Sequence, residues 1–185
     1  MCMHPAIFLD RDGVLIENNP YYVRSWSDVK IYPEAIDALS RIVNSSFKVI
    51  IITNQSAVGR GLISYETAED INKQLIAEIH SRGGQVDGIF MCPHSPEDDC
   101  TCRKPKPGLI IQAAKELKLD LKQSLMIGDA LTDLIAGQKA GIPTNVLVLT
   151  GRGKKQASLI EASQIKSLRI YNDLAEALEK LIQLS

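Results

Sequence analysis

Residues 6–14 read AIFLDRDGV, so four apolar residues run without a break into two aspartates and a glycine. A short apolar run that stops abruptly at polar residues is typical of a buried strand in a parallel sheet. Asp10 and Asp12 are two positions apart, so their carboxylates point to the same side of an extended chain. Gly13 then lets the backbone turn. Taken alone, this pair fits a solvated polar turn equally well, and the rest of the chain decides between the two.

Similar apolar runs alternate with helical patterns along the chain. The candidate strands are Ala6–Leu9, Lys48–Thr53, Val86–Met91, Ser124–Ile127, Thr144–Leu149 and Leu168–Tyr171. The candidate helices are Pro33–Asn44, Tyr65–Arg82, Gly108–Leu117, Leu131–Ala140 and Asp173–Leu184. Apolar strands separated by helices predict an α/β fold, with an open parallel sheet covered by helices on both faces. We find no repeat, linker or low-complexity tract, so we expect residues 1–185 to form a single domain.

The composition is ordinary for a soluble globular protein, with 45% hydrophobic and 23% charged residues. A net charge of −1 provides no basic field for nucleic acid or anionic membranes, so we expect neither as a partner. No apolar stretch approaches the roughly 20 residues of a membrane span, and the first residues lack the layout of a signal peptide. These features predict a cytoplasmic protein, which we expect to be a monomer that acts on a small molecule.

Polar residues also follow the second and fourth candidate strands, at the sheet edge where parallel sheets bind ligands. Thr53 and Asn54 offer a hydroxyl and backbone N–H groups to phosphate oxygens, unless they form an ordinary turn. Asp129 and Asp133 offer the oxygen ligands that Mg²⁺ prefers, unless Asp129 merely caps the next helix. Arg103–Lys104 adds positive charge, although a solvated basic loop looks the same. Together these groups supply a nucleophile, a proton donor, cations and a metal site, as phosphoryl transfer requires.

Three cysteines and a histidine are grouped just before Lys104. Cys92, His94, Cys100 and Cys102 offer three thiolates and one imidazole, a complete tetrahedral set for zinc. Four protein ligands leave no open position, so we expect a structural Zn²⁺ that staples this loop over the site. The alternative is a set of free or buried cysteines. We call residues 92–104 the cysteine loop.

These residues resemble the motifs of the haloacid dehalogenase-like (HAD) phosphatases, over almost the whole chain. The first motif matches Asp10–Val14, the second Thr53, the third Lys104 and the fourth Gly128–Asp133. The resemblance implies a Rossmann-like open sheet without a large cap domain. It also implies a phosphatase that forms an aspartyl-phosphate intermediate and depends on Mg²⁺.

The same resemblance implies a role for each motif residue. Asp10 is the nucleophile, and Asp12 is the general acid and base. Thr53 and Lys104 bind the transferring phosphoryl group. The expected Mg²⁺ ligands are Asp10, Asp129 and the backbone carbonyl of Asp12, with Asp133 in support.

Residues 92–108, CPHSPEDDCTCRKPKPG, resemble one branch of these phosphatases, which includes the D-glycero-D-manno-heptose 1,7-bisphosphate 7-phosphatases and the related histidinol-phosphatases. FLDRDGVL (8–15), TNQS (53–56) and RGL (60–62) fit the heptose enzymes better. The resemblance implies removal of the 7-phosphate, with Asn54 and Arg103 among the substrate-binding residues. Ala130 departs from the branch, whose members often carry a lysine or arginine there. Histidinol phosphate is the runner-up substrate, and a catalytically silent, zinc-stabilised binding module is the alternative from another class.

The chain has no insertion large enough for a folded cap domain between its motifs. Glu17–Tyr32 and the cysteine loop are therefore the segments expected to rim the site. Tyr21, Tyr22 and Trp26 line this rim or anchor it to the core.

Overall fold

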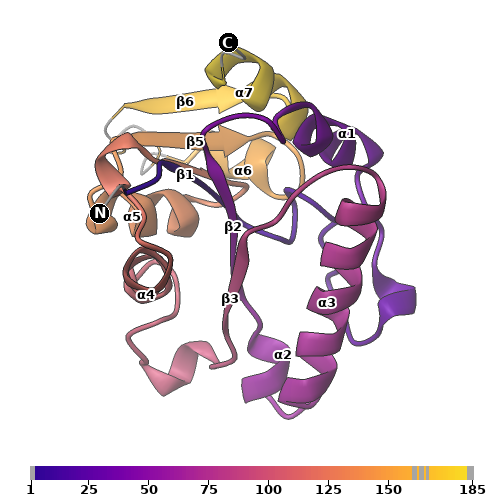
Figure 1. The fold of residues 1–185 in the computed structure, drawn as a ribbon. Helices are drawn as coiled ribbons and strands as arrows, with labels where there is room; N and C mark the ends of the chain where they lie inside the picture. Colours follow the sequence, from indigo (N-terminus) through magenta and orange to yellow (C-terminus); the bar gives the residue numbers. More distant parts are fainter. Residues whose placement is uncertain (1–2, 160–161, 163–164, 166, 183–185) are drawn as a thin grey trace.

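The computed structural model describes residues 3–159, 162, 165 and 167–182. Within these residues, six strands form one parallel sheet in the order β3-β2-β1-β4-β5-β6. The strands are β1 Ala6–Leu9, β2 Lys48–Asn54, β3 Gly88–Cys92, β4 Leu125–Gly128, β5 Thr144–Val148 and β6 Leu168–Tyr171. Helices lie on both sides of this sheet (Figure 1). The predicted open parallel sheet is confirmed.

In the part of the chain that the structure describes, five longer α-helices correspond to the predicted ones, and two short α-helices were not predicted. The helices are α1 Pro33–Arg41, α2 Ser56–Gly59, α3 Tyr65–Ser81, α4 Gly108–Leu117, α5 Leu131–Ala140, α6 Gly153–Ala157 and α7 Leu174–Leu181. Helix α1 ends three residues before the predicted Asn44. The predicted end of α7, at Leu184, lies outside the described residues. Helices α2 and α6 are too short to show a helical period in the sequence.

The apolar core lies on both faces of the sheet, and β1 shows why its sequence is uninterrupted. Ile7 and Leu9 pack into a cluster with apolar residues of α1, α3 and α7. Ala6 and Phe8 face the opposite way, into a cluster with residues of α4 and α5. All four are fully buried. Burying a side chain as large as Leu9 contributes roughly 1.5–3 kcal/mol, so both faces stabilise the strand.

Several helix ends follow the signals in the sequence. The Ser64 hydroxyl accepts a hydrogen bond from the Thr67 backbone N–H (3.1 Å) and caps α3. Helix α5 ends at Gly141, whose φ of +87° lies in the left-handed region that favours glycine. None of the helices in the described part of the chain is long and apolar enough to cross a membrane.

The order of the strands places the site. From β1 the chain crosses to β2 on one side, whereas β4 lies on the other side of β1. Ligands of open parallel sheets bind where the strand order reverses, beyond the carboxyl ends of the strands. The residues after β1 and β4 therefore meet at the place where the sequence puts its acidic motifs.

Candidate active site

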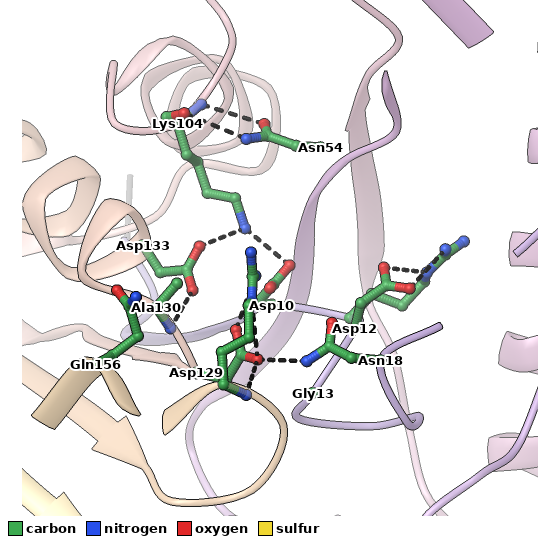
Figure 2. Close-up of polar contacts among 12 residues, drawn as sticks. Asp10, Asp12, Gly13, Asn18, Asn54, Lys104, Asp129, Ala130, Asp133 and Gln156 are labelled. Carbon is green, nitrogen blue, oxygen red and sulfur yellow. Dashed lines mark hydrogen bonds and ion pairs between the residues drawn. The ribbon is translucent and has the colours of Figure 1, made fainter. Parts of the chain in front are cut away.

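Asp10 follows β1 directly and stays in line with the sheet. Its backbone N–H donates to the carbonyl of Ile127 in β4 (3.0 Å), which extends the pairing of β1 with β4 by one residue. The side chain is buried, with 4% of the residue exposed, and Oδ1 accepts a hydrogen bond from Lys104 (2.8 Å). The sheet therefore fixes this carboxylate in one orientation beneath the ammonium group (Figure 2).

Lys104 reaches the same point from the cysteine loop. Its Nζ pairs with Asp10 Oδ1 (2.8 Å) and Asp133 Oδ1 (2.7 Å) and donates to the carbonyl of Ile52 (2.8 Å). Burial opposes the charged form, but the two carboxylates outweigh it and raise the pKa of Lys104 above its ordinary value. The site thus contains a permanent cation that is almost completely shielded from water.

Asn54 binds the backbone of Lys104 rather than its side chain. Its Oδ1 accepts from the Lys104 N–H (3.1 Å), and its Nδ2 donates to the Lys104 carbonyl (3.2 Å). This two-point clamp joins the end of β2 to the cysteine loop (Figure 2). Asn54 therefore positions Lys104. Asn54 also lines the central cleft described below.

Three buried carboxylates form a group that suits a divalent cation. Asp10, Asp129 and Asp133 each offer an oxygen, and these oxygens lie within 4.8 Å of one another. Burial raises the pKa of Asp10 to about 7; Lys104 opposes this rise, and the neighbouring Asp133, Asp129 and Asp12 add to it. Buried like charges repel one another, and a cation among them removes that cost. Hard oxygen donors of this type fit Mg²⁺.

Asp129 and Asp133 have different surroundings. Asp133 Oδ2 accepts from the Ala130 N–H at the start of α5 (3.1 Å), so Asp133 closes this helix end, and Asp129 does not cap it. Asp129 is fully buried and binds Arg152, whose backbone N–H and Nη2 lie 2.8 and 3.0 Å from its two oxygens. Asn18 donates to the same carboxylate. The capping alternative for Asp129 is therefore wrong.

The Asp12 side chain is held by hydrogen bonds from two neighbouring side chains, Arg11 and Gln55. Arg11 donates to both of its carboxylate oxygens, and Gln55 Nε2 donates to Oδ2 (3.0 Å). The same Gln55 amide also donates to the hydroxyl of Thr53 (2.7 Å). Thr53 is fully buried and is not among the residues that line the cleft described below. Gln55 thus links the predicted acid and base to the predicted phosphate-binding hydroxyl.

A polar cleft of about 370 Å³ opens above these groups, and we call it the central cleft. Glu17–Tyr32 and the cysteine loop both contribute to its rim, as the sequence predicts. Tyr22 lies on the cleft, whereas Trp26 packs against the core. Its lining residues are Asp10, Asp12, Asn18, Asn19, Tyr22, Val23, Asn54, Gln55, Ser56, Arg60, Pro96, Arg103, Lys104, Thr132, Asp133 and Arg152. The lining includes four cations, Arg60, Arg103, Lys104 and Arg152, and this positive charge suits an anionic ligand.

The cysteine loop brings its four predicted zinc ligands together. Cys92, His94, Cys100 and Cys102 form one group, with Sγ–Sγ and Sγ–Nδ1 distances of 3.1–3.6 Å. Tetrahedral ligands about 2.3 Å from zinc are separated by about 3.8 Å, so only small movements are needed to bind the metal. Burial opposes ionisation of Cys100, but hydrogen bonds lower its pKa to about 7, which favours a thiolate ligand.

The chain is similar to named proteins along most of its length. A sequence model described as HAD-hydrolase-like matches residues 101–177. A relative in Bordetella bronchiseptica is named D-glycero-beta-D-manno-heptose-1,7-bisphosphate 7-phosphatase. It is 37% identical over 177 residues, which cover 96% of this chain and 97% of the relative. This chain belongs to that family of HAD-like phosphatases. A relative of the same name in Haemophilus influenzae is 41% identical over 157 residues, covering 81% of this chain and 84% of the relative.

The fold of the chain also matches that of a solved structure of this family. The crystal structure of D,D-heptose 1,7-bisphosphate phosphatase from B. bronchiseptica, complexed with magnesium and phosphate, matches with a TM-score of 0.87. It is 37% identical, and the match covers 96% of this chain and 97% of that one. The predicted family and fold are therefore confirmed.

Three polar residues of this HAD-like site were missed in the sequence. Asn18 and Arg152 bind Asp129, and Gln55 binds Asp12. Arg152 follows β5, so the rule that ligands bind beyond the carboxyl ends of strands could have marked it as a site residue, but not as the partner of Asp129. Gln55 lies within the TNQS segment, but the sequence does not indicate that it binds Asp12. Nothing in the sequence distinguished Asn18 from an ordinary loop residue.

Proposed function

We propose that this chain is a Mg²⁺-dependent phosphatase that removes the 7-phosphate of D-glycero-D-manno-heptose 1,7-bisphosphate. The observation that carries this proposal is the buried Asp10–Lys104–Asp133 group at the base of a cationic cleft. The 37% identity to a named heptose bisphosphate phosphatase, over 97% of that relative, supports the substrate. A silent binding module is not favoured, because its site would not need a buried nucleophile beside a buried lysine.

The reaction begins with attack of an Asp10 oxygen on phosphorus, which forms an aspartyl phosphate. Asp12 gives a proton to the leaving oxygen and later takes one from the attacking water. Lys104 neutralises charge on the phosphoryl oxygens, and Thr53 offers them its hydroxyl. Mg²⁺, which Asp10, Asp129 and the backbone carbonyl of Asp12 would hold with support from Asp133, supplies charge neutralisation and orientation.

Arg103 is our candidate for binding the second, non-reacting phosphate. Its Nη1 donates to the carbonyl of His94 (3.1 Å), so the cysteine loop holds the guanidinium at the rim of the cleft. A guanidinium matches phosphate oxygens in shape and charge. Binding energy from the remote phosphate then orients the reacting one. Arg60 and Arg152 line the same cleft and add positive charge there, whereas Ala130 provides none.

Substituting Arg103→Ala should lower kcat/KM for the heptose bisphosphate about 10- to 100-fold, the range expected for one charge-assisted contact. Hydrolysis of p-nitrophenyl phosphate, which has no second phosphate, should change much less. Lys106→Ala is the matched control, because Lys106 lies in the adjacent segment but pairs with Asp99. Phosphate release by each variant measures both effects.

Histidinol phosphate tests the runner-up function. The wild-type protein should hydrolyse the heptose 1,7-bisphosphate with a far higher kcat/KM than histidinol phosphate or heptose monophosphates. A preference for histidinol phosphate in the same phosphate-release panel would replace the proposed substrate and leave the phosphatase mechanism in place.

We also propose that Cys92, His94, Cys100 and Cys102 bind one structural Zn²⁺. Purified protein should contain about one zinc per chain by elemental analysis. Cys100→Ala should lose the metal, lower the melting temperature and reduce activity, because energy of binding at a structural site is also folding energy. Cys2→Ala, at a cysteine far upstream in the sequence, should keep the metal. Zinc-free protein prepared without chelators would refute the site.

The organisation of the chain completes the proposal. We infer that residues 1–185 act as one HAD-like domain, as a monomer in the cytoplasm. The single sheet and its shared cores support the first inference. Neither nucleic acid nor a membrane belongs to the proposed function, and a sugar phosphate is the expected partner.

A further inference from the structure

Arg11, between the two catalytic acids, is one of the largest fully buried side chains, with 1% of the residue exposed. Its Nε and Nη2 donate to the two oxygens of Asp12, at 3.0 and 3.1 Å. A guanidinium loses much solvation free energy when buried, so it needs partners for its charge and its donors. Asp12 is the charged partner, and the bidentate geometry defines the orientation of its carboxylate.

The third contact of Arg11 comes from a distant helix. Nη1 donates to the side-chain oxygen of Asn72 in α3 (2.8 Å). Asn72 is 3% exposed and stands on the face of α3 that otherwise buries Ala68, Ile71 and Leu75. An apolar residue is the usual choice at such a position, and a buried amide is costly unless it is bonded. The amide is therefore explained by the guanidinium that it anchors.

Both carboxylate oxygens of Asp12 accept hydrogen bonds, but they differ in the number of donors. Oδ2 accepts from Arg11 Nε and from Gln55 Nε2 (both 3.0 Å), whereas within the described part of the chain Oδ1 accepts from Arg11 Nη2 only. The Asp12 side chain is 23% exposed and lies on the cleft. Oδ1 therefore has fewer donors than Oδ2 and is the oxygen better placed to exchange a proton with a ligand in the cleft.

We propose that Arg11, anchored by Asn72, is a positioning residue that orients Asp12 for proton transfer. The inference rests on the proposed phosphatase function. As the ester P–O bond breaks, the Asp12 proton passes to the leaving oxygen, which yields the alcohol and the Asp12 carboxylate. That carboxylate then takes a proton from the water that attacks the aspartyl phosphate, which releases inorganic phosphate and frees Asp10. In both steps a rotated Asp12 side chain misplaces the proton.

The test uses two esters that differ in their need for an acid. The oxygen of n-propyl phosphate leaves only with a proton, whereas that of 2,4-dinitrophenyl phosphate departs without one. Asn72→Ala should lower kcat for the propyl ester about 10- to 100-fold, with little change in KM, because misplaced proton transfer costs this much. For the dinitrophenyl ester, formation of the aspartyl phosphate in a single turnover should change less than about threefold. Arg11→Lys, which keeps the charge but loses the fork, should show the same pattern.

Leu75→Ala is the matched control, because it removes a buried side chain of α3 that has no polar group to bond Arg11. It should lower the melting temperature and affect the two esters equally. Equal losses on both esters in Asn72→Ala, or no loss on either, would overturn the positioning role while wild-type hydrolysis still supports the proposed function. A wild-type protein that hydrolyses neither these esters nor the heptose bisphosphate would overturn the proposed function itself.

Discussion

Asp10→Asn abolishes hydrolysis of every phosphate ester, with an expected loss on the order of 10⁴-fold or more in kcat. The substituted amide keeps the shape of the side chain but is too weak a nucleophile to form the aspartyl phosphate. Loss of an essential nucleophile typically removes nearly the whole chemical rate, leaving only what binding contributes. Phosphate release under single-turnover conditions measures the loss. Asp12→Asn should also be severely impaired, because it removes the proton donor.

The fold should survive Asp10→Asn. Lys104 loses one charged partner but keeps Asp133 Oδ1 (2.7 Å) and the Ile52 carbonyl (2.8 Å). The substitution also removes one of several buried like charges. Its melting temperature should therefore lie close to that of the wild type. Asp37→Asn, at an exposed position on α1, is the matched control and should keep full activity. Near-normal turnover by folded Asp10→Asn would exclude the covalent mechanism.

The sheet was predictable because its strands are buried on both faces. Ala6–Leu9 is apolar at every position, and its predicted bounds are those observed. Boundaries shifted where hydrogen bonding continued into polar residues, as at Asn54, which still pairs with Cys92 of β3. Hydropathy cannot locate such ends, because the ladder bonds are made by the backbone.

The motif acids were predictable from their place after strands, but their partners were not. The contact between Arg11 and Asn72 spans 61 residues of sequence, and that between Arg152 and Asp129 spans 23. The helical periodicity of α3 shows that Asn72 lies on its buried face, but it does not show that the amide binds Arg11. Such contacts follow from the tertiary packing of the helices against the sheet, whereas the sequence pattern specifies each position only as buried or exposed.

Removal of Mg²⁺ by a chelator should lower activity by on the order of 10³-fold, the scale of the several kcal/mol that a metal supplies at a reacting phosphate. Added Mg²⁺ should restore it. Ca²⁺ should not, because its longer and looser coordination misplaces nucleophile and phosphate. Asp129→Asn should weaken Mg²⁺ binding in calorimetry, whereas Asp120→Asn, away from the cleft, should leave it unchanged. Full activity in metal-free buffer would contradict the metal site.

The pH dependence of Mg²⁺ binding gives a second measure of this site. In the metal-free protein the pKa of Asp10 is raised to about 7, mainly by burial, from an ordinary value near 4. A proton on Asp10 competes with the cation for the same oxygens. Mg²⁺ affinity should therefore rise as the pH increases from about 6 to about 8. Calorimetric titrations across this range measure the change, and a flat affinity would show that Asp10 is not a ligand.

The free energy of unfolding of the metal-free protein should decrease as the pH rises, in contrast to the Mg²⁺ affinity. Because folding raises the pKa of Asp10, the folded state holds a proton that the unfolded chain has lost between about pH 4 and about pH 7. This contribution to stability is complete below about pH 4 and disappears as the pH rises through about 7. Mg²⁺ binds the ionised form, so the increase in melting temperature that it causes should grow with pH. An increase that is the same at about pH 6 and about pH 8 would mean that the cation binds elsewhere, because only a site containing Asp10 couples the two equilibria.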